Sequence, residues 1–510
     1  MLARVHSHLL HGIDAHLCEV EVDLEEGGEN RQTVVGLPDA AVTESLQRVR
    51  SALTNAGYAF PLGRLLINLA PADVRKEGPV YDLPIAIGTL IVQGIVPQRS
   101  RDDGLLDPRK VAFAGELALD GRLRPIRGAI AVAAMARQRG LEALVLPAAN
   151  ADEAALVEGI EVLGVSTLAE VVGLLRGELE PEPTRTPDLQ TMLEEATPAI
   201  DFAEVRGQES VKRAITIAAA GMHNLLMLGP AGSGKSMMAK ALPGVLPQLT
   251  PEEAIEVTRI YSSAGALPAG ERVIRTRPVR SPHHTASAPA IVGGGAVARP
   301  GEISLAHRGV LFLDELPEFA KSVLETLRQP LEDHVVAIAR ASGTVSFPAS
   351  FMLVAAMNPT PKGDVAPGEV GRREMDRYLA RLSGPLLDRI DIHVEAPVVP
   401  FNELRAHKPG TSTAEMRAQA EIARQRQAER QGSATPNSRL SGKQLDRWCV
   451  MDDAASALLG QAMGQLGLSA RAYDKIRRVS RTIADLARSE RVTGEHVAEA
   501  VGYRLLDRRV

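Results

Sequence analysis

A phosphate-binding loop constrains this chain more than any other feature of its sequence. Residues 224–228 (NLLML) form an apolar, strand-like run that leads directly into residues 229–236 (GPAGSGKS), a complete GxxxxGK[ST] pattern. Glycines let such a backbone curl so that its N–H groups point at a β-phosphate, while the lysine reaches the β- and γ-phosphates and the last hydroxyl ligates Mg²⁺. The pattern predicts nucleotide binding by Gly229, Pro230, Ala231, Gly232, Ser233, Gly234, Lys235 and Ser236.

A second apolar run carries the acidic pair that nucleotide hydrolysis needs. Residues 309–313 (GVLFL) end in Asp314 and Glu315, and we expect this strand to be the neighbour of the strand at 224–228. Asp314 is predicted to hold Mg²⁺ together with Ser236, and Glu315 to polarise the attacking water. ATP and Mg²⁺ are therefore the expected cofactors. A surface glycine loop beside an unrelated apolar strand is the alternative interpretation.

Three more polar residues complete the predicted catalytic set. Asn358 follows the apolar run 351–357, and we interpret its amide as a γ-phosphate sensor that orients the lytic water. Arg389 is expected to reach the γ-phosphate of a neighbouring subunit, which predicts an active site shared between subunits. Arg471 opens a basic helix and is predicted to be a second sensor that couples the position of a lid to the nucleotide state. A structural or solvated ion pair is the alternative for both arginines.

The length of the chain and a proline-rich break in its sequence predict several domains. A chain of 510 residues is too long for one core. An acidic, proline-rich stretch at 177–187 cannot continue a helix or strand. The expected parts are a mixed α/β domain at 1–176, a linker at 177–200, a doubly wound nucleotide-binding core at 201–400 and a helical region at 401–510, with helices at 403–431, 441–465 and 469–488.

Composition adds few constraints. The net charge is -5, so a surface that binds polyanions must be local rather than global. The two cysteines, Cys18 and Cys449, lie far apart and have no metal-binding spacing, which favours a reduced setting without zinc. No apolar run approaches the roughly 20 residues of a membrane helix. We therefore expect a soluble, cytoplasmic protein that has no membrane partner.

Longer segments resemble the magnesium-chelatase-like AAA+ family, in particular its ComM/YifB competence branch. The resemblance covers almost the whole chain, and its most specific segments are residues 280–285 (RSPHHT), 293–295 (GGG), 299–307 (RPGEISLAH), 327–333 (LRQPLED) and 382–389 (LSGPLLDR). It implies an AAA+ P-loop core with a pre-sensor β-hairpin, a helical lid whose arginine acts in trans, and a hexameric ring. It also implies an ATP-driven DNA motor for helicase activity or branch migration during natural transformation.

The sequence offers basic segments for a DNA contact. Arg272, Arg275, Arg277 and Arg280 precede His283, His284 and a glycine-rich loop, and Arg340 lies in an expected hairpin of residues 335–340 and 344–347. Contacts of this kind are independent of base sequence and sensitive to salt. The alternative is that these arginines bind acidic side chains or a neighbouring subunit. The two adjacent histidines are expected to point apart and to cap or pack rather than share a metal.

The N-terminal region resembles the proteolytic domain of Lon-type proteases at residues 115–126 (GELALDGRLRPI). Catalysis of that kind needs a serine activated by a lysine within hydrogen-bond reach. The serine-bearing segment corresponds to residues 78–80 (GPV), the lysine position falls near Ile130, and Lys76 has no serine beside it in the sequence. We therefore expect a non-proteolytic Lon-like module that contacts DNA or other subunits.

Two functional classes remain open. The leading hypothesis is a hexameric DNA motor, and the alternative is a magnesium-chelatase-like ATPase that remodels proteins without DNA activity. Many relatives carry a cysteine-rich segment after the sensor asparagine, whereas residues 358–369 (NPTPKGDVAPGE) contain no cysteine. A metal-stabilised loop is therefore not expected at this place.

Overall fold

The computed structural model describes residues 1–25, 30–98, 106–197, 200–268, 270–295, 298–340, 343–360, 375, 377–400, 410–504 and 506. The chain divides into two compact units. Unit 1 comprises Met1–Leu189 and Ala254–Ile274, and unit 2 comprises Gln190–Glu253 and Arg275–Val510. The first division falls inside the segment 177–200. The segment Ala254–Ile274 lies within the sequence of the nucleotide-binding region but packs with unit 1.

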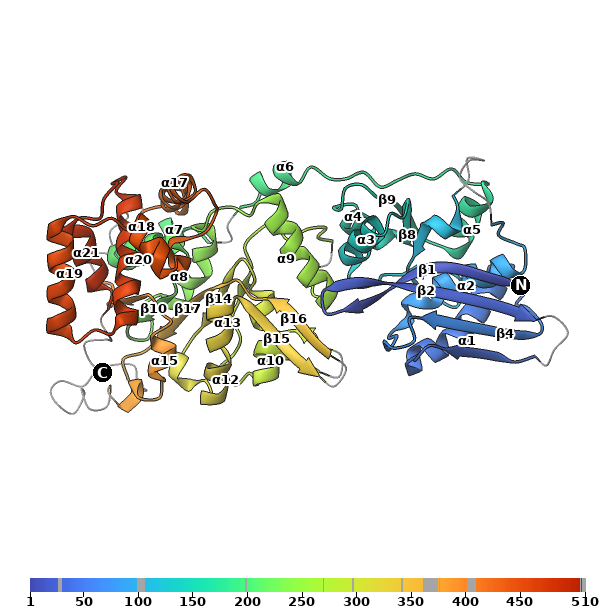
Figure 1. Ribbon diagram of the computed structural model, residues 1–510, viewed down its shortest axis with the longest axis horizontal. Coiled ribbons are helices and arrows are strands. Elements are labelled where there is room, and N and C mark those ends of the chain that lie inside the picture. Colours follow the sequence, from blue (N-terminus) through green and yellow to red (C-terminus); the bar gives the residue numbers. More distant parts are fainter. Residues whose placement is uncertain are drawn as a thin grey trace. The chain divides into compact units, whose positions relative to one another are not determined.

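Unit 1 is built on a mixed seven-stranded sheet (Figure 1). Its longest strands, β1 (Leu2–His11) and β2 (Asp14–Glu25), pair antiparallel, and β2 buries alternate residues as expected for a strand with one covered face. The strand order is β3-β4-β2-β1-β5-β8-β9, with β3 (Gln32–Val35), β4 (Arg64–Ala70), β5 (Val111–Phe113), β8 (Ala143–Pro147) and β9 (Glu161–Val165). A small ribbon pairs β6 (Glu116–Leu117) with β7 (Leu123–Arg124).

Helices complete unit 1 around one apolar core. Helix α2 (Asp82–Val92) is buried along its whole length and packs on β1 and β2, while α1 (Ala40–Asn55) packs on α2. The predicted helix near 129–139 is confirmed as α3, which contacts β2 and α4. The remaining helices are α3 (Ala129–Gln138), α4 (Ala148–Ala154), α5 (Leu168–Arg176) and most of α9 (Pro251–Ala264).

Unit 2 contains a five-stranded sheet in which every pairing is parallel. The order is β11-β14-β17-β10-β18, with β11 (Val279–Arg280), β14 (Val310–Leu313), β17 (Met352–Met357), β10 (Leu225–Leu228) and β18 (Ile392–Glu395). The central strands are continuous apolar runs whose residues are all buried, as expected where helices cover both faces of a parallel sheet. The strands predicted at 224–228, 309–313 and 351–357 are confirmed.

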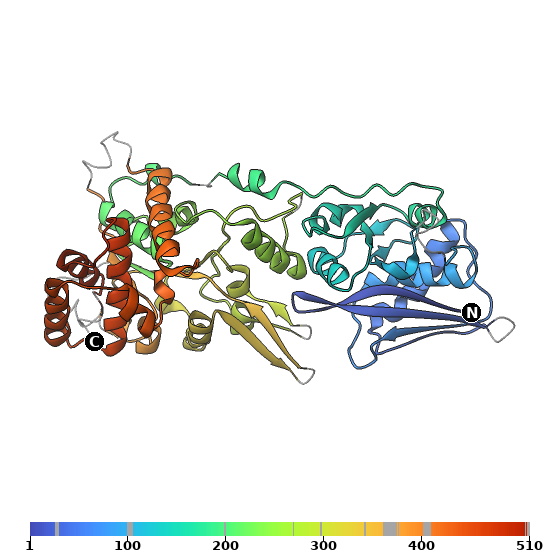
Figure 2. The same cartoon turned by 45° about the horizontal axis from the view of Figure 1, so that its top comes forward.

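The helices of unit 2 share one apolar core with this sheet. Helix α7 packs on β10 and β18, and α8 packs on β17. In Figures 1 and 2 the C-terminal helices gather at the end of unit 2 away from the hairpin of β15 (Val335–Arg340) and β16 (Gly343–Pro348). The helices are α6 (Leu189–Glu194), α7 (Glu209–Gly221), α8 (Lys235–Ala241), α10 (Ala288–Val292), α11 (Glu302–Leu305), α12 (Lys321–Thr326), α13 (Arg328–Asp333), α15 (Gly384–Leu387), α17 (Thr413–Gln431), α18 (Gly442–Trp448), α19 (Asp453–Leu466), α20 (Ala470–Leu486) and α21 (Gly494–Gly502).

One predicted helix of the C-terminal region is wrong. The segment 441–465 forms two helices, α18 and α19, because Asp452 caps a new helix by accepting a hydrogen bond from Ala455 N. Met451 also forms an isolated bridge with Val492, which draws the backbone out of the helical path. The predicted helix at 469–488 is confirmed as α20, and that at 403–431 is confirmed from Thr413 onward; residues 403–409 lie outside the described residues.

The predicted hairpin before Asn358 is confirmed. Strands β15 (Val335–Arg340) and β16 (Gly343–Pro348) pair antiparallel from Val335 opposite Pro348 to Arg340 opposite Gly343. Beside it, β12 (Gly293–Gly294) pairs with β13 (Arg299–Pro300).

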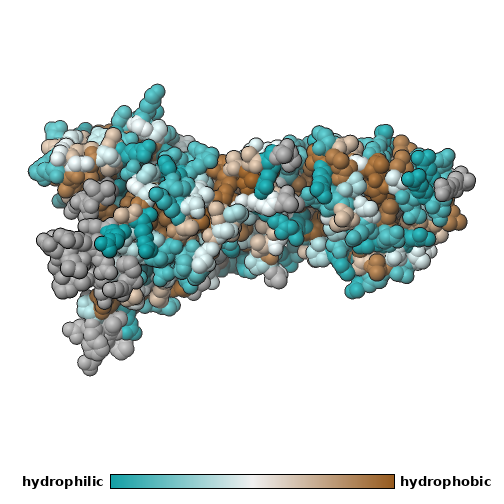
Figure 3. Space-filling model, turned by 90° about the horizontal axis from the view of Figure 1, so that it is seen from below, coloured by the Kyte–Doolittle hydropathy of each residue, from teal (hydrophilic) through white to brown (hydrophobic). Residues whose placement is uncertain are grey.

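Seen as a surface, one face of the molecule mixes hydrophilic with hydrophobic residues (Figure 3). In the part of the chain that the structure describes, no helix is both long and apolar enough to cross a membrane.

Candidate nucleotide site

The phosphate loop follows β10 at the carboxyl edge of the unit 2 sheet, where ligands of open parallel sheets bind. A Cβ on Gly229 would lie 2.1 Å from the carbonyl oxygen of Ala396, so only glycine fits where the loop leaves the strand. Gly232 and Gly234 have φ values of +79° and +87°, which favour glycine, and nothing lies within 4 Å of a Cβ placed on either. Backbone conformation, rather than lack of space, is therefore what favours glycine at these two positions.

The Lys235 ammonium lies at the centre of this loop. It donates to the carbonyl oxygens of Gly229 and Pro230, at 2.8 and 2.7 Å, and to Asn358 Oδ1 at 3.2 Å. Burial lowers the pKa of Lys235, and the nearby Asp314 carboxylate opposes that shift. The structure thus brings together a cation from the loop after β10 and the amide that follows β17.

The Ser236 hydroxyl lies against the Asp314 carboxylate, with 2.5 Å between Ser236 Oγ and Asp314 Oδ2. One detail of the prediction is wrong, because β14 is not the neighbour of β10. Strand β17 lies between them and pairs with both. This arrangement places Asn358, at the end of β17, between the phosphate loop and the acidic pair.

Glu315 lies in a strained conformation directly after Asp314. Its φ is +52°, in the left-handed region that non-glycine residues rarely adopt, and such strain often occurs at functional sites. Its carboxylate lies 3.5 Å from His284 Nδ1. The His284 ring also contacts Phe319 edge-on and lies 4.1 Å, between centroids, from the His283 ring. The expectation that the two histidines point apart is therefore wrong, and sequence reasoning missed the contact between His284 and Glu315.

These residues fit a Mg²⁺-nucleotide. A hydroxyl and a carboxylate oxygen converge at one point, which is the donor set that Mg²⁺ prefers together with phosphates and water. The Lys235 ammonium, which donates to two backbone carbonyls and to Asn358, supplies the positive charge that phosphate groups need at this place. No cluster of three or more His, Cys, Asp or Glu side chains suited to a metal ion occurs among the described residues.

Arg389 and Arg471 lie at the opposite edge of the sheet. The backbone of Arg389 precedes β18, and its carbonyl accepts a hydrogen bond from the side chain of Asn224, the residue before β10. Its guanidinium pairs with Glu332 at 2.5 Å, as the ion-pair alternative expects. Arg471 Nη1 lies 3.4 Å from Asp388 Oδ2, so it belongs to the same edge. A four-residue strand rises about 13 Å, and the phosphate loop lies at its other end. The structure therefore does not bring either arginine to the phosphate loop of its own chain.

The basic segment before β11 is mostly paired within its own unit. Arg277 is largely buried and donates to Glu253 at 2.9 Å and to three backbone carbonyls. Arg280 forms a two-bond ion pair with Glu302, and Arg272 pairs with Asp152 at 2.9 Å. These contacts support the alternative in which the arginines bind acidic side chains.

Two other arginines are exposed beside the hairpin. Arg340 ends β15, and Arg299 lies on β13 opposite Gly294. A Cβ on Gly294 would lie 3.4 Å from Arg340 Nη2, so the Arg340 guanidinium lies beside the same glycine that pairs with Arg299. Neither forms an ion pair with a described residue. The sequence singled out Arg340 but not Arg299.

Unit 1 shows no serine–lysine dyad at the predicted positions in its described part. Lys76 is fully buried, donates to the carbonyl of Pro71, and has a pKa lowered by burial. Ile130 lies in α3, and its N–H donates to Glu153 Oε1.

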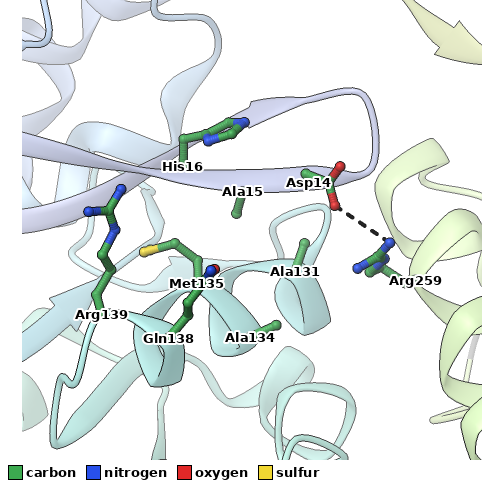
Figure 4. Close-up of a pocket in the computed structure, with 9 residues that line it drawn as sticks. All are labelled: Asp14, Ala15, His16, Ala131, Ala134, Met135, Gln138, Arg139 and Arg259. Atoms are coloured by element: carbon green, nitrogen blue, oxygen red, sulfur yellow. Dashed lines mark ion pairs between the residues drawn. The ribbon is translucent and has the colours of Figure 1, made fainter. Parts of the chain in front are cut away.

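A separate cavity of about 510 Å³ lies between β2, α3 and Arg259 of α9 (Figure 4). Asp14 and Arg259 pair across it at 3.5 Å, and none of the predicted nucleotide-binding residues lines it.

The segment 358–369 is described only to Thr360, so the expectation about its missing metal loop lies outside the described residues from 361 onward.

Comparisons with known proteins agree over the whole chain. Three family models match in succession: subunit ChlI of Mg-chelatase at residues 20–150, magnesium chelatase subunit ChlI at 201–404, and its C-terminal part at 410–504. Competence protein ComM of Haemophilus influenzae is 43% identical over 99% of this chain and 98% of its own length. The uncharacterized protein YifB of Escherichia coli is 42% identical with the same coverage. The magnesium-chelatase 38 kDa subunit of Rhodobacter capsulatus is 27% identical over 40% of this chain and 60% of its own. The chain therefore belongs to the magnesium-chelatase-like family of ComM and YifB proteins.

Proposed function

We propose that this protein is a Mg²⁺-dependent ATP hydrolase that assembles into a ring and moves DNA strands.

The observation that carries the proposal is the meeting of four side chains at the carboxyl edge of the sheet. Lys235 contacts Asn358, and Ser236 contacts Asp314, across three parallel strands. In P-loop hydrolases the lysine neutralises phosphate charge, the hydroxyl and the aspartate hold Mg²⁺, and a nearby residue directs the attacking water. Glu315 is the base in this proposal, and Asn358 orients the same water.

The position of the arginines supports a site shared between copies of the chain. The backbones that carry Arg389 and Arg471 lie at the amino ends of the strands, and a four-residue strand, which rises about 13 Å, separates that edge from the phosphate loop. An arginine that reaches the γ-phosphate must then come from another copy, bound head to tail. Repeated head-to-tail contacts close into a ring when the rotation permits. A hexamer is the proposed ring.

DNA is the proposed substrate of the motor. Arg299 and Arg340 are exposed around Gly294 and have no acidic partner among the described residues, which suits a contact with backbone phosphate. The name of the Haemophilus influenzae relative, a competence protein, favours DNA taken up during natural transformation. In this proposal Arg277 and Arg280, which are paired with acidic side chains, stabilise the fold and do not contact DNA.

The test is ATP hydrolysis by the full chain with single-stranded, duplex and forked DNA at two salt concentrations. Lys235→Ala is the control without nucleotide binding. We expect stimulation by DNA that weakens at higher salt, and Arg340→Ala should reduce it more than Arg122→Ala, an exposed arginine of unit 1. A rate that no DNA alters would contradict the DNA motor and favour a protein-remodelling ATPase.

A further inference from the structure

A buried cluster of charged and polar side chains lies at the amino edge of the unit 2 sheet. Lys475 Nζ lies 3.1 Å from Asp391 Oδ1, and both residues are less than 10% exposed. The other carboxylate oxygen accepts a hydrogen bond from Asn224 N at 3.0 Å and lies 3.6 Å from His223 Nδ1. His223 in turn contacts Thr482 of α20 at 2.8 Å.

Stability alone does not account for this cluster. Removing two charges from water is costly, and a well-packed apolar pair of similar size is often at least as stable as a buried ion pair. A buried ion pair does fix the register of the elements that carry it, because neither charge can move without losing its partner. The function of this ion pair is therefore best inferred from the two structural elements that it holds in register.

The pair joins the two elements that carry the proposed trans-acting arginines. Asp391 follows Arg389 by two residues, where the chain enters β18. Lys475 follows Arg471 by four residues, which is about one turn of α20 and puts both on one side of the helix. Arg471 reaches Asp388 at 3.4 Å, so its guanidinium lies beside the residue that precedes Arg389, while the Arg389 guanidinium pairs with Glu332.

We propose that the Asp391–Lys475 ion pair is a positioning device that sets Arg389 and Arg471 in register for the nucleotide of a neighbouring copy. The proposal rests on the shared site described under the proposed function. Neither Asp391 nor Lys475 touches nucleotide, because both are buried behind the sheet edge. Their effect on hydrolysis passes through the two arginines.

The test uses the full chain with Asp391→Asn and Lys475→Met together, so that no buried charge is left unpaired. The phosphate loop of this double variant is intact, so the variant should bind ATP as the wild type does. Its rate of ATP turnover should fall by about tenfold or more, because the arginines are no longer held in place. The double variant is then mixed in equal amounts with Lys235→Ala, which has intact arginines but binds no nucleotide. The mixture should regain up to about one quarter of the wild-type rate. About a quarter of the interfaces then combine a phosphate loop from the double variant with arginines from Lys235→Ala. A fold defect alone would not be rescued in this way.

Two companion samples separate the possible failures. In the reference mixture, Arg389→Ala is combined with Lys235→Ala; if this mixture stays inactive, the shared site itself is wrong. If it recovers and the mixture with the double variant does not, the positioning proposal is wrong. Arg430→Met removes a different ion pair of α20, that with Asp485, and should leave turnover near the wild-type value. Should the double variant not fold, Asp391→Glu keeps the charge and shifts the carboxylate, and unchanged turnover in that variant would overturn the proposal.

Discussion

The hydroxyl of Ser236 and the carboxylate of Asp314 are in contact at 2.5 Å although their strands are not neighbours in the sheet. The contact is possible because both residues follow parallel strands at the same edge, with β17 between them. Ser236 lies in the first turn of α8, which packs on β17, and this packing brings its hydroxyl to the acidic pair. Two oxygen ligands from separate parts of the chain thus meet without any further rearrangement of the strands.

Ser236→Ala should weaken the use of Mg²⁺. Removing one of two oxygen donors is expected to raise the Mg²⁺ concentration that gives half-maximal hydrolysis by about 10-fold to 100-fold. The measurement is a titration of hydrolysis with Mg²⁺ after chelation has removed the metal. Ser233→Ala is the matched control, because its hydroxyl lies in the same loop but 3.4 Å from Lys235 rather than on Asp314. Equal curves for the two variants would contradict the assignment of Ser236.

Glu315→Gln should bind ATP normally and lose turnover by roughly 10² to 10⁴, because an amide cannot accept a proton from water. Binding is measured with a fluorescent nucleotide and turnover by phosphate release. Glu318→Gln is the control, since this carboxylate lies in the same loop but pairs with Arg381 at 2.9 Å. Unchanged turnover in Glu315→Gln would rule out its role as the base.

His284→Ala should reduce turnover by about tenfold, less than the loss of the base itself, because the imidazole holds the Glu315 side chain in place. If His284 acts only through Glu315, adding His284→Ala to Glu315→Gln should cause no further loss. His283→Ala should have a smaller effect, since that ring reaches Thr285. Additive losses in the double variant would show that His284 acts independently.

Acid should destabilise unit 2 partly through Asp391. Burial alone would raise the pKa of Asp391, but Lys475 and His223 hold it below its usual range, and His393 and Arg504 lie nearby. A lowered folded pKa gives stability that is full above the unfolded value of about 3.9 and is lost as the pH falls below it. Unfolding midpoints between pH 3 and 6, followed by the single tryptophan Trp448, should therefore fall more steeply in the wild type than in Asp391→Asn/Lys475→Met. Asp446→Asn, an exposed carboxylate, should keep the wild-type slope.

Much of the nucleotide site was predictable because its parts are local patterns. Apolar runs that end in polar residues predicted the strands and placed Asp314 and Asn358 at one edge, since parallel strands share their carboxyl ends. The order of the strands was not predictable in the same way. An intervening strand such as β17 leaves no local pattern, because its pairing partners are far away in sequence.

Contacts between distant side chains were the other part that sequence reasoning missed. A run of arginines looks like a basic surface, but Arg277 and Arg280 find Glu253 and Glu302, which are more than 20 residues away. The contact of His284 with Glu315 and the cluster around Asp391 likewise depend on tertiary packing. The helix break before Asp452 does have a local signal, an Asp at a helix start, but the helical pattern continues on both sides of it.

The most direct test of the account is the specific ATPase activity of the wild-type protein as a function of its concentration, with the assembly state of the same samples measured by mass photometry. A site that takes its phosphate loop from one copy and its arginines from another predicts that activity per chain rises with assembly and vanishes in the isolated chain. Full activity per chain at dilutions where only single chains are present would contradict the account.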